Sequence, residues 1–186
     1  MAMATAIPHY TADEVRHFPD DRLRYEVIRG ELFVSPAPGI PHQRVVRDLV
    51  HLVHDYLVRH NLGEALPGPF EVQFTEDSAV QPDVLAILNN RGPQPTRKRL
   101  HGPPALVIEI ISYSSKRTDR LQKRMLYLEE GVPEYWIVDP DLKQIERWRS
   151  GDEAPEILTQ EIAWRPVPEA PPLTIDLSRL FQASEI

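Results

Sequence analysis

The pattern of apolar and polar residues, together with one capping motif, predicts helices at four places in the chain. From about residue 41 to residue 60 these residues recur with a helical period, which indicates a long amphipathic helix ending at Gly63. A later helix is predicted over residues 116 to 130. Near the N-terminus, Thr11 and Glu14 have the spacing of a capping box, which predicts a short first helix. The proline-rich C-terminal segment ends in a short stretch typical of a helix packed on the outside.

Shorter segments have the alternation expected of β-strands. Two β-prone runs on either side of Arg29 and Gly30 predict a hairpin. Residues 70 to 75 alternate between apolar and polar side chains, which predicts a half-buried strand. The segments QPDVLAIL (residues 81 to 88) and ALVIEII (residues 105 to 111) are apolar on both faces, apart from one acidic residue in each, so we expect two central strands.

The remaining segments complete the pattern of an α/β domain. Residues 89 to 104 are rich in Pro, Gly and Arg and predict an exposed loop without regular structure. Residues 133 to 150 predict a strand followed by its hairpin partner. We therefore expect a mixed central β-sheet flanked by helices, with an N-terminal helix and hairpin, folded as a single domain over residues 1 to 186.

The composition limits the chemistry that is available to the chain. With 41% hydrophobic residues and no apolar run near the ~18 residues of a membrane span, we expect a protein that does not enter the membrane. The N-terminal segment lacks the basic and apolar regions of a signal peptide, so we expect a cytoplasmic protein. Without cysteines, any metal must be held by carboxylates or histidines, which favours Mg²⁺ or Mn²⁺.

The charge is unevenly distributed along the chain. The formal net charge is -7, but residues 91 to 124 hold nine basic and two acidic residues, so this segment carries +7 and the remainder -14. A basic segment around a buried acid is a plausible footprint for a phosphate-rich ligand. Ordinary solvated loop and helix charges would give the same count, and the count alone does not separate the two interpretations.

Two acidic residues lie where the pattern predicts burial. Asp83 begins the apolar part of VQPDVLAILNN, and Glu109 lies inside PPALVIEIISYSS. Ionised side chains are rarely buried unless they are paired or bind a metal. If the two strands are antiparallel neighbours, both carboxylates reach one point, with Glu109 on the same face as Val107 and Ile111. Such a pair predicts a Mg²⁺ or Mn²⁺ site, although a purely structural role stays open.

The same residues carry a resemblance to a known superfamily. Pro82 and Asp83, followed by Glu109 on the next core strand, resemble the catalytic pattern of the PD-(D/E)XK nucleases. Over about residues 10 to 180, the chain resembles more specifically the Uma-type family, which is assigned as restriction endonucleases. That likeness rests on the ordered motifs YEVIRGELFVSPAP, PHQRVV, VQPDVLAI, LVIEIISYSS and DRLQKRMLYLEEGVPEYWIVDP. It implies a restriction-endonuclease-like core, a Mg²⁺ or Mn²⁺ cofactor bound by Asp83 and Glu109, and DNA as the substrate.

The chain departs from the superfamily pattern at one position. Ile111 stands two residues after Glu109, where the pattern has a basic residue. In the families that this chain resembles, a lysine from the following helix supplies the missing charge, which implies Lys123 here, with Lys116 as the second choice. Such a lysine would position or deprotonate the attacking water or stabilise the phosphate.

Helical geometry is compatible with this role for Lys123. Leu126 and Tyr127 flank Lys123 on one side of the predicted helix, opposite an apolar stripe formed by Leu121, Met125 and Leu128. Apolar neighbours would desolvate the ammonium group. A structural alternative stays open, in which Lys123 packs on Tyr127 and pairs with Asp119 four residues earlier.

Two further residues are candidates for supporting roles. Glu31 matches the Gly-Glu motif of the family and could serve as a third metal or water ligand, although an exposed turn acid fits the pattern as well. His42 could contact phosphate from the N-terminal end of the long helix, but a histidine at a helix entry without a special role is the preferred interpretation.

Three functions are compatible with these observations. The leading hypothesis is a Mg²⁺- or Mn²⁺-dependent DNA endonuclease in which Asp83 and Glu109 bind the metal and Lys123 assists the water. The main rival is a nuclease-fold interaction module that binds nucleic acid or a protein partner with weak or no catalysis, and the third is a metallohydrolase of small molecules. A homodimer would allow both strands of a duplex to be cut.

Overall fold

Three β-sheets organise the part of the chain that the computed structural model describes, residues 8 to 111 and 118 to 182. The strands are β1 (Leu23–Ile28), β2 (Glu31–Pro36), β3 (Gly63–Pro67), β4 (Glu71–Thr75), β5 (Ser78–Val80), β6 (Val84–Leu88), β7 (Arg99–His101), β8 (Leu106–Ile110), β9 (Glu134–Asp139), β10 (Gln144–Arg149), β11 (Glu156–Leu158), β12 (Glu161–Trp164) and β13 (Leu173–Asp176). The largest sheet has the order β11-β10-β9-β8-β6-β3, a second has the order β2-β1-β5-β4-β7, and β12 pairs with β13.

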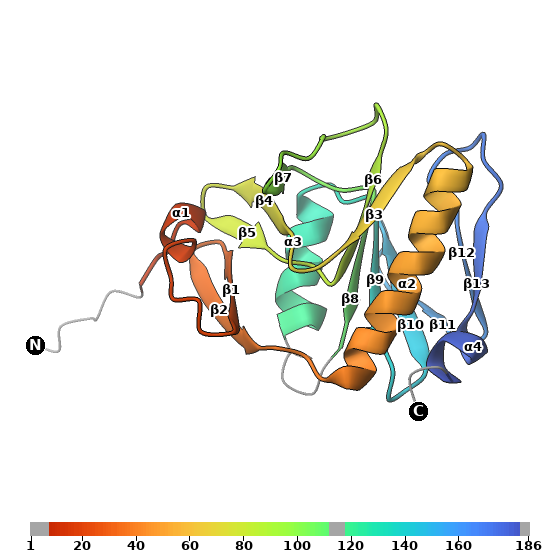
Figure 1. The fold of residues 1–186 in the computed structure, drawn as a ribbon, viewed down its shortest axis with the longest axis horizontal. Coiled ribbons are helices and arrows are strands. Elements are labelled where there is room, and N and C mark those ends of the chain that lie inside the picture. The colour runs from red at the N-terminus through yellow and green to blue at the C-terminus, as the bar shows by residue number, and fades with distance from the viewer. Residues whose placement is uncertain (1–7, 112–117, 183–186) are drawn as a thin grey trace, which may run out of the picture.

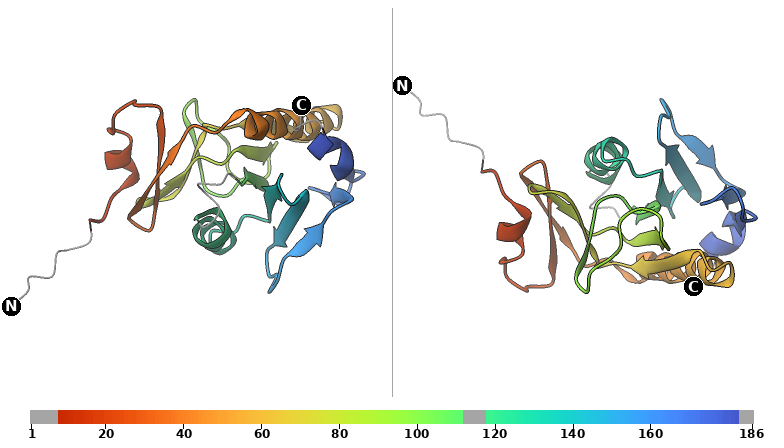
Figure 2. Two further views of the ribbon diagram at one scale, coloured as in Figure 1. Left: turned by 90° about the horizontal axis from the view of Figure 1, so that it is seen from below. Right: turned by 90° about the horizontal axis from the view of Figure 1, so that it is seen from above.

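Helices cover both faces of the largest sheet (Figures 1 and 2). They are α1 (Ala12–Val15), α2 (Ile40–Arg59), α3 (Arg124–Glu129), which continues from a π-helical turn η1 (Thr118–Lys123), and α4 (Leu177–Gln182). Helix α2 packs on one face, and α3 lies on the opposite face with the second sheet beside it. Strands β8 and β9 are parallel whereas β6 and β8 are antiparallel, so the sheet is mixed. The predicted α/β architecture is therefore confirmed.

The N-terminal elements follow the predicted pattern. The Thr11 hydroxyl accepts a hydrogen bond from the Glu14 backbone N–H at 3.3 Å, and the Glu14 carboxylate accepts one from the Thr11 N–H at 2.7 Å. This capping box begins α1. The hairpin of β1 and β2 turns at Arg29 and Gly30, whose φ angles of 52° and 78° lie in the left-handed region that such tight turns require.

The long helix ends at Arg59, four residues before the predicted glycine. Asn61, with φ 51°, takes the left-handed position after α2, and the Leu62 N–H donates to the Leu57 carbonyl at 2.8 Å. Gly63 instead opens β3, where a Cβ atom would lie 1.9 Å from the carbonyl oxygen of Ile87 on β6. The glycine is therefore needed for the close approach of two strands, and its predicted role as helix stop is wrong.

The two central strands carry the acids as predicted. Every residue of β6 and β8 is buried, and the strands pair antiparallel with Val84 opposite Ile108. Asp83, one residue before β6, therefore lies level with Glu109 on β8. Side chains such as Ile108 pack toward α2, whereas Val107 packs toward α3 and the second sheet. Because Glu109 alternates with Ile108, it faces the α3 side of the sheet.

Several strands escaped prediction because their pattern is short. Strand β7 lies within the segment predicted as an irregular loop, and it pairs in parallel with β4 and buries Leu100 completely. A single apolar residue among arginines, prolines and glycines has no periodicity, so only pairing with β4 makes this segment a strand. The short strands β3, β5, β11, β12 and β13 were missed as well.

The helix that carries Lys123 buries the opposite face from the predicted apolar stripe. Leu121 and Met125 are 46% and 41% exposed, whereas Lys123, Leu126 and Tyr127 are buried. The π-helical turn before α3 changes the helical period at this point. The apolar residues nearest to Lys123 therefore form the packed face, and the lysine is carried into the interior with them. Helix α4 is confirmed, and its residues Leu177, Leu180 and Phe181 join the core.

Candidate active site

Asp83 is held at the end of β6 by contacts from three other elements. Pairing between β6 and β8 stops at Val84, so the Ile110 N–H lies beyond the last paired position and donates to Asp83 Oδ2 at 2.9 Å. His42 Nε2, from the first turn of α2, lies 3.0 Å from the same oxygen. Arg24 Nη1, from β1, donates to Asp83 Oδ1 at 3.1 Å. The carboxylate therefore connects the largest sheet, the second sheet and the long helix α2.

The surroundings of Asp83 favour its ionised form. Burial by itself would raise the pKa of this carboxyl group, but the hydrogen bond and charge of His42, together with the charges of Arg24 and Lys123, outweigh burial and lower the pKa to about 2. Burial by itself lowers the pKa of Arg24. The nearby carboxylates of Asp83, Glu26 and Glu109 raise it by more, so the net shift of this pKa is upward. Asp83 is therefore ionised throughout the physiological pH range, so it accepts hydrogen bonds and pairs with positively charged groups.

Acidification is expected to remove the stability that ionised Asp83 supplies. Because the folded-state pKa lies below the ordinary value of 3.8, the contribution is complete above pH 3.8 and is lost as the pH falls toward about 2. The shift corresponds to roughly 2 kcal/mol. Urea unfolding of wild type and Asp83→Asn from pH 5 to pH 2.5 should show their stability difference shrinking over this interval. A constant difference would contradict the proposed environment of Asp83.

Glu109 and Lys123 form a buried ion pair on the α3 side of the sheet. Lys123 Nζ donates to Glu109 Oε1 at 2.9 Å, and the Tyr127 hydroxyl donates to the same oxygen at 2.7 Å. Burial and the nearby charge of Glu109 raise the pKa of Tyr127 well above its ordinary value, so the phenol keeps its proton. The side chain of Asp119, the alternative partner considered for Lys123, lies outside the described residues.

A third buried acid, Glu26, was missed in the sequence. Glu26 Oε1, on β1, lies 3.0 Å from Lys123 Nζ and accepts a hydrogen bond from the Gln81 N–H at 2.6 Å. The signal that could have revealed it is the one that revealed Glu109, an acid inside an apolar run, here YEVI. Arg24, two residues earlier on the same strand, was missed as well. Lys123 therefore contacts one carboxylate from the second sheet, Glu26, and one from the largest sheet, Glu109.

The other predicted site residues lie at different places. The sequence favoured a histidine at a helix entry without a special role, but His42 contacts Asp83. Its contact with phosphate stays a prediction. Glu31 is exposed at the first position of β2, opposite Ile28 across the hairpin, and its role as a third ligand also stays a prediction. Lys116 lies outside the described residues.

The donor chemistry of the cluster fits a hard divalent cation. Three buried carboxylic acids (Glu26, Asp83 and Glu109) contact two basic side chains (Arg24 and Lys123). Carboxylate oxygens are the ligands that Mg²⁺ and Mn²⁺ prefer, and one or two protein carboxylates are usual. In the described residues, however, no three His, Asp or Glu side chains converge as a ready-made metal site. Asp83 and Glu109 would hold the ion, with water and substrate as further ligands.

The described residues of the basic segment do not form one patch around these acids. Arg124 stacks on Trp148 at 4.6 Å, Arg99 pairs with Glu71 at 3.3 Å, and Lys123 is buried in the cluster. Arg97 and Lys98 are exposed near β7. The described residues of the segment are therefore distributed over several surfaces. A common phosphate-binding footprint for the whole segment stays a prediction.

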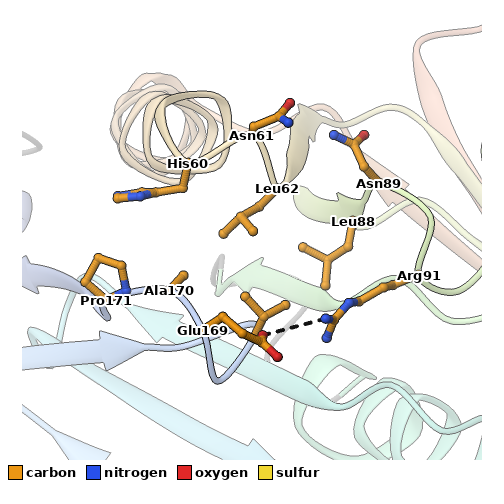
Figure 3. A pocket seen from close by; sticks show the side chains of 10 residues that line it. His60, Asn61, Leu62, Leu88, Asn89, Arg91, Glu169, Ala170 and Pro171 are labelled. Atoms are coloured by element: carbon orange, nitrogen blue, oxygen red, sulfur yellow. Dashed lines mark ion pairs between the residues drawn. The ribbon is translucent and has the colours of Figure 1, made fainter.

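Arg91, at the start of the basic segment, belongs to a separate pocket of about 470 Å³ (Figure 3). Leu62 and Leu88 point into this pocket, and Arg91 reaches toward Glu169 at 3.6 Å. Strand β6 runs from the residue after Asp83 to Leu88, so the pocket lies roughly 16 Å along the strand from that acid. It is distinct from the buried cluster.

Comparison with known proteins identifies the family. A family model described as "Uma2: Putative restriction endonuclease" matches residues 12 to 182, so the chain belongs to this family. Membership supports a nuclease function and a nucleic acid substrate. No protein with a curated description matches the chain.

A solved structure confirms the fold that this family implies. The crystal structure of a protein from Anabaena variabilis, described as "a putative nuclease belonging to DUF820", has a TM-score of 0.77 and 22% sequence identity to this chain. The match covers 94% of this chain and 99% of that one. The predicted restriction-endonuclease-like fold is therefore confirmed. Among the described helices, none is long and apolar enough to cross a membrane.

Proposed function

We propose that this protein is a Mg²⁺- or Mn²⁺-dependent endonuclease that hydrolyses DNA phosphodiester bonds. One observation carries the proposal: Asp83 and Glu109, buried at the same level of two antiparallel strands, lie beside a buried lysine whose Nζ is 2.9 Å from Glu109 Oε1. Membership in a restriction endonuclease family supports DNA as the substrate class.

Asp83 and Glu109 would hold the divalent ion in this reaction. When bound, the ion neutralises charge that develops on the phosphate and promotes ionisation of a water molecule. The backbone N–H of Ile110 and the side chains of His42 and Arg24 fix Asp83 in position, so the donor geometry is prepared before any ligand arrives. In the hydrolysis, a bond forms between phosphorus and the water oxygen while the bond to the leaving oxygen breaks.

Lys123 supplies the positive charge that the sequence motif lacks at Ile111. Its ammonium group is a hydrogen-bond donor that can orient the attacking water or contact a phosphate oxygen beside the ion. Its burial strengthens such contacts, because charges interact more strongly away from bulk water. A duplex has two strands to cut, and a homodimer with two such sites would serve this purpose.

One observation favours an interaction module as the second candidate function. In the described residues, each of the three carboxylates of the cluster contacts the side chain of Arg24 or Lys123, and no group of three acids or histidines is ready for a metal. This arrangement would suit a nuclease fold that keeps its network for stability and binds nucleic acid without cutting it. A small-molecule hydrolase would differ from both by activity that changes little with salt, since DNA binding weakens steeply as counterions are released.

Titration of Mn²⁺ into the protein in a calorimeter tests the nuclease proposal without a choice of substrate. We expect wild type to bind Mn²⁺ and Asp83→Asn to lose most of that affinity, because the variant keeps the size of the side chain but removes its charge. Asp55→Asn, on the exposed side of α2, should bind like wild type. If wild type binds no Mn²⁺ in the presence or absence of DNA, the interaction module becomes the better account.

A further inference from the structure

We propose that Glu26 is the positioning residue that holds Lys123 for the reaction. This inference rests on the proposed nuclease function and adds a residue to its machinery. Glu26 belongs to β1 of the second sheet, whereas Glu109 belongs to β8 of the largest sheet. Lys123 Nζ lies 3.0 Å from Glu26 Oε1 and 2.9 Å from Glu109 Oε1. The ammonium group is therefore contacted from two sheets at once.

The burial of Glu26 requires an explanation of this kind. Its side chain is 5% exposed, close to that of Asp83 at 4%, and a carboxylate this deep in the protein is costly unless it is paired. Lys123 is the ion-pair partner that meets this requirement. The hairpin, which lies outside the pair of central strands, thus contributes a buried charge to the site.

Glu26 also connects Lys123 to the segment that leads into Asp83. The same Oε1 atom accepts a hydrogen bond from the Gln81 N–H at 2.6 Å, two residues before Asp83. One carboxylate oxygen therefore contacts both the lysine and the chain that carries the first acid. A shift of this oxygen would move Lys123 relative to Asp83 and Glu109 together.

Lys123 needs a second carboxylate partner to hold its ammonium group in one position. A lysine side chain has a flexible four-carbon stem, and a single ion pair leaves several rotamers available. Glu109 Oε1, its first partner, is shared with the hydroxyl of Tyr127. The carboxylate of Glu26, as a second partner, restricts the ammonium group to the space between β1 and β8. Because misplacement by about 1 Å can lower a rate 10²-fold, this restriction affects catalysis.

The test compares two variants of Glu26 with wild type in Mn²⁺-dependent DNA cleavage. Glu26→Gln removes the charge, and Glu26→Asp keeps the charge but withdraws it by one methylene. We expect kcat to fall about tenfold to a hundredfold in both, with KM and Mn²⁺ affinity within about threefold of wild type. The matched control, Glu161→Gln on the exposed side of β12, should behave as wild type.

A second background separates positioning from a general structural role. In Lys123→Met, Glu26→Gln should cause no further loss of kcat, because a residue that acts through Lys123 has nothing left to position. An equal loss in both backgrounds, or a Glu26→Gln variant as active as wild type, would overturn the inference. If wild type binds Mn²⁺ and cleaves DNA while these results appear, the nuclease proposal survives and only the role of Glu26 fails.

A measurement without metal or DNA keeps the inference testable if a variant loses activity by misfolding. Lys123 is almost completely buried, so acetylation of its amine by an N-hydroxysuccinimide ester should be slow in wild type. In Glu26→Asp, which retains the ion charge that favours folding, peptide mass spectrometry should show labelling of Lys123 about tenfold faster, with Lys98 unchanged. Labelling of Lys123 at the wild-type rate would overturn the contact.

Discussion

Asp83→Asn is expected to lose DNA cleavage by about 10³-fold or more. The substitution preserves the size of the side chain but removes the negative charge that a divalent ion requires. Metal stabilisation of the transition state amounts to several kcal/mol, and each 1.36 kcal/mol corresponds to a tenfold change in rate. Cleavage should be measured with purified protein, Mn²⁺, and both supercoiled plasmid and single-stranded circular DNA as substrates.

Asp55→Asn provides the control for this experiment. Asp55 pairs with Arg59 on the surface of α2, so the same chemical change occurs away from the buried cluster and should leave cleavage unchanged. Retention of full cleavage by Asp83→Asn would contradict the assignment of the site. Salt-dependent DNA binding by wild type without any cleavage would instead support the interaction module.

Lys123→Met is expected to destabilise the fold by about 3 to 5 kcal/mol, because it leaves Glu26 and Glu109 buried without their cation. Methionine fills a similar volume, so lost packing contributes little. Urea unfolding followed by circular dichroism at pH 7 measures the difference. Lys98→Met, at an exposed position, should change stability by less than about 0.5 kcal/mol.

The double variant Lys123→Met with Glu109→Gln tests the cause of that loss. Neutralising one of the two carboxylates that have lost their cation should restore part of the stability, so the two changes should not be additive. Additive losses would indicate that Lys123 and Glu109 contribute independently. A loss for Lys123→Met as small as that for Lys98→Met would contradict the buried ion pairs altogether.

Much of the fold could be predicted because its longer elements carry local signals. The helical period before residue 60 predicted α2, and the apolar runs around Asp83 and Glu109 predicted β6 and β8. Their antiparallel pairing, assumed from the chemistry of the two acids, is confirmed. Strand β7 was missed because a three-residue strand gains its hydrogen bonds and burial only from a distant partner.

The candidate site could be predicted only in part. Asp83, Glu109 and Lys123 were found from acids in apolar runs and from the family resemblance, and the structure brings them together, while their catalytic roles stay predictions. Arg24 and Glu26 were missed because the acid within the short run YEVI was overlooked, and the sequence does not show which face of the hairpin another element covers. The inner face of the hairpin becomes buried only when the second sheet packs beside α3.

By itself, the sequence determined the local elements and the residue types available for chemistry. Periodicity acts over a few residues, so it fixes which side chains share a face of a helix or strand. Only the tertiary structure decided which of those faces meet. Glu26, Asp83, Glu109 and Lys123 are far apart along the chain, and the order of strands in two sheets places them in one buried cluster. Pairing between distant strands is a collective result of burial and hydrogen bonding, which no single segment encodes.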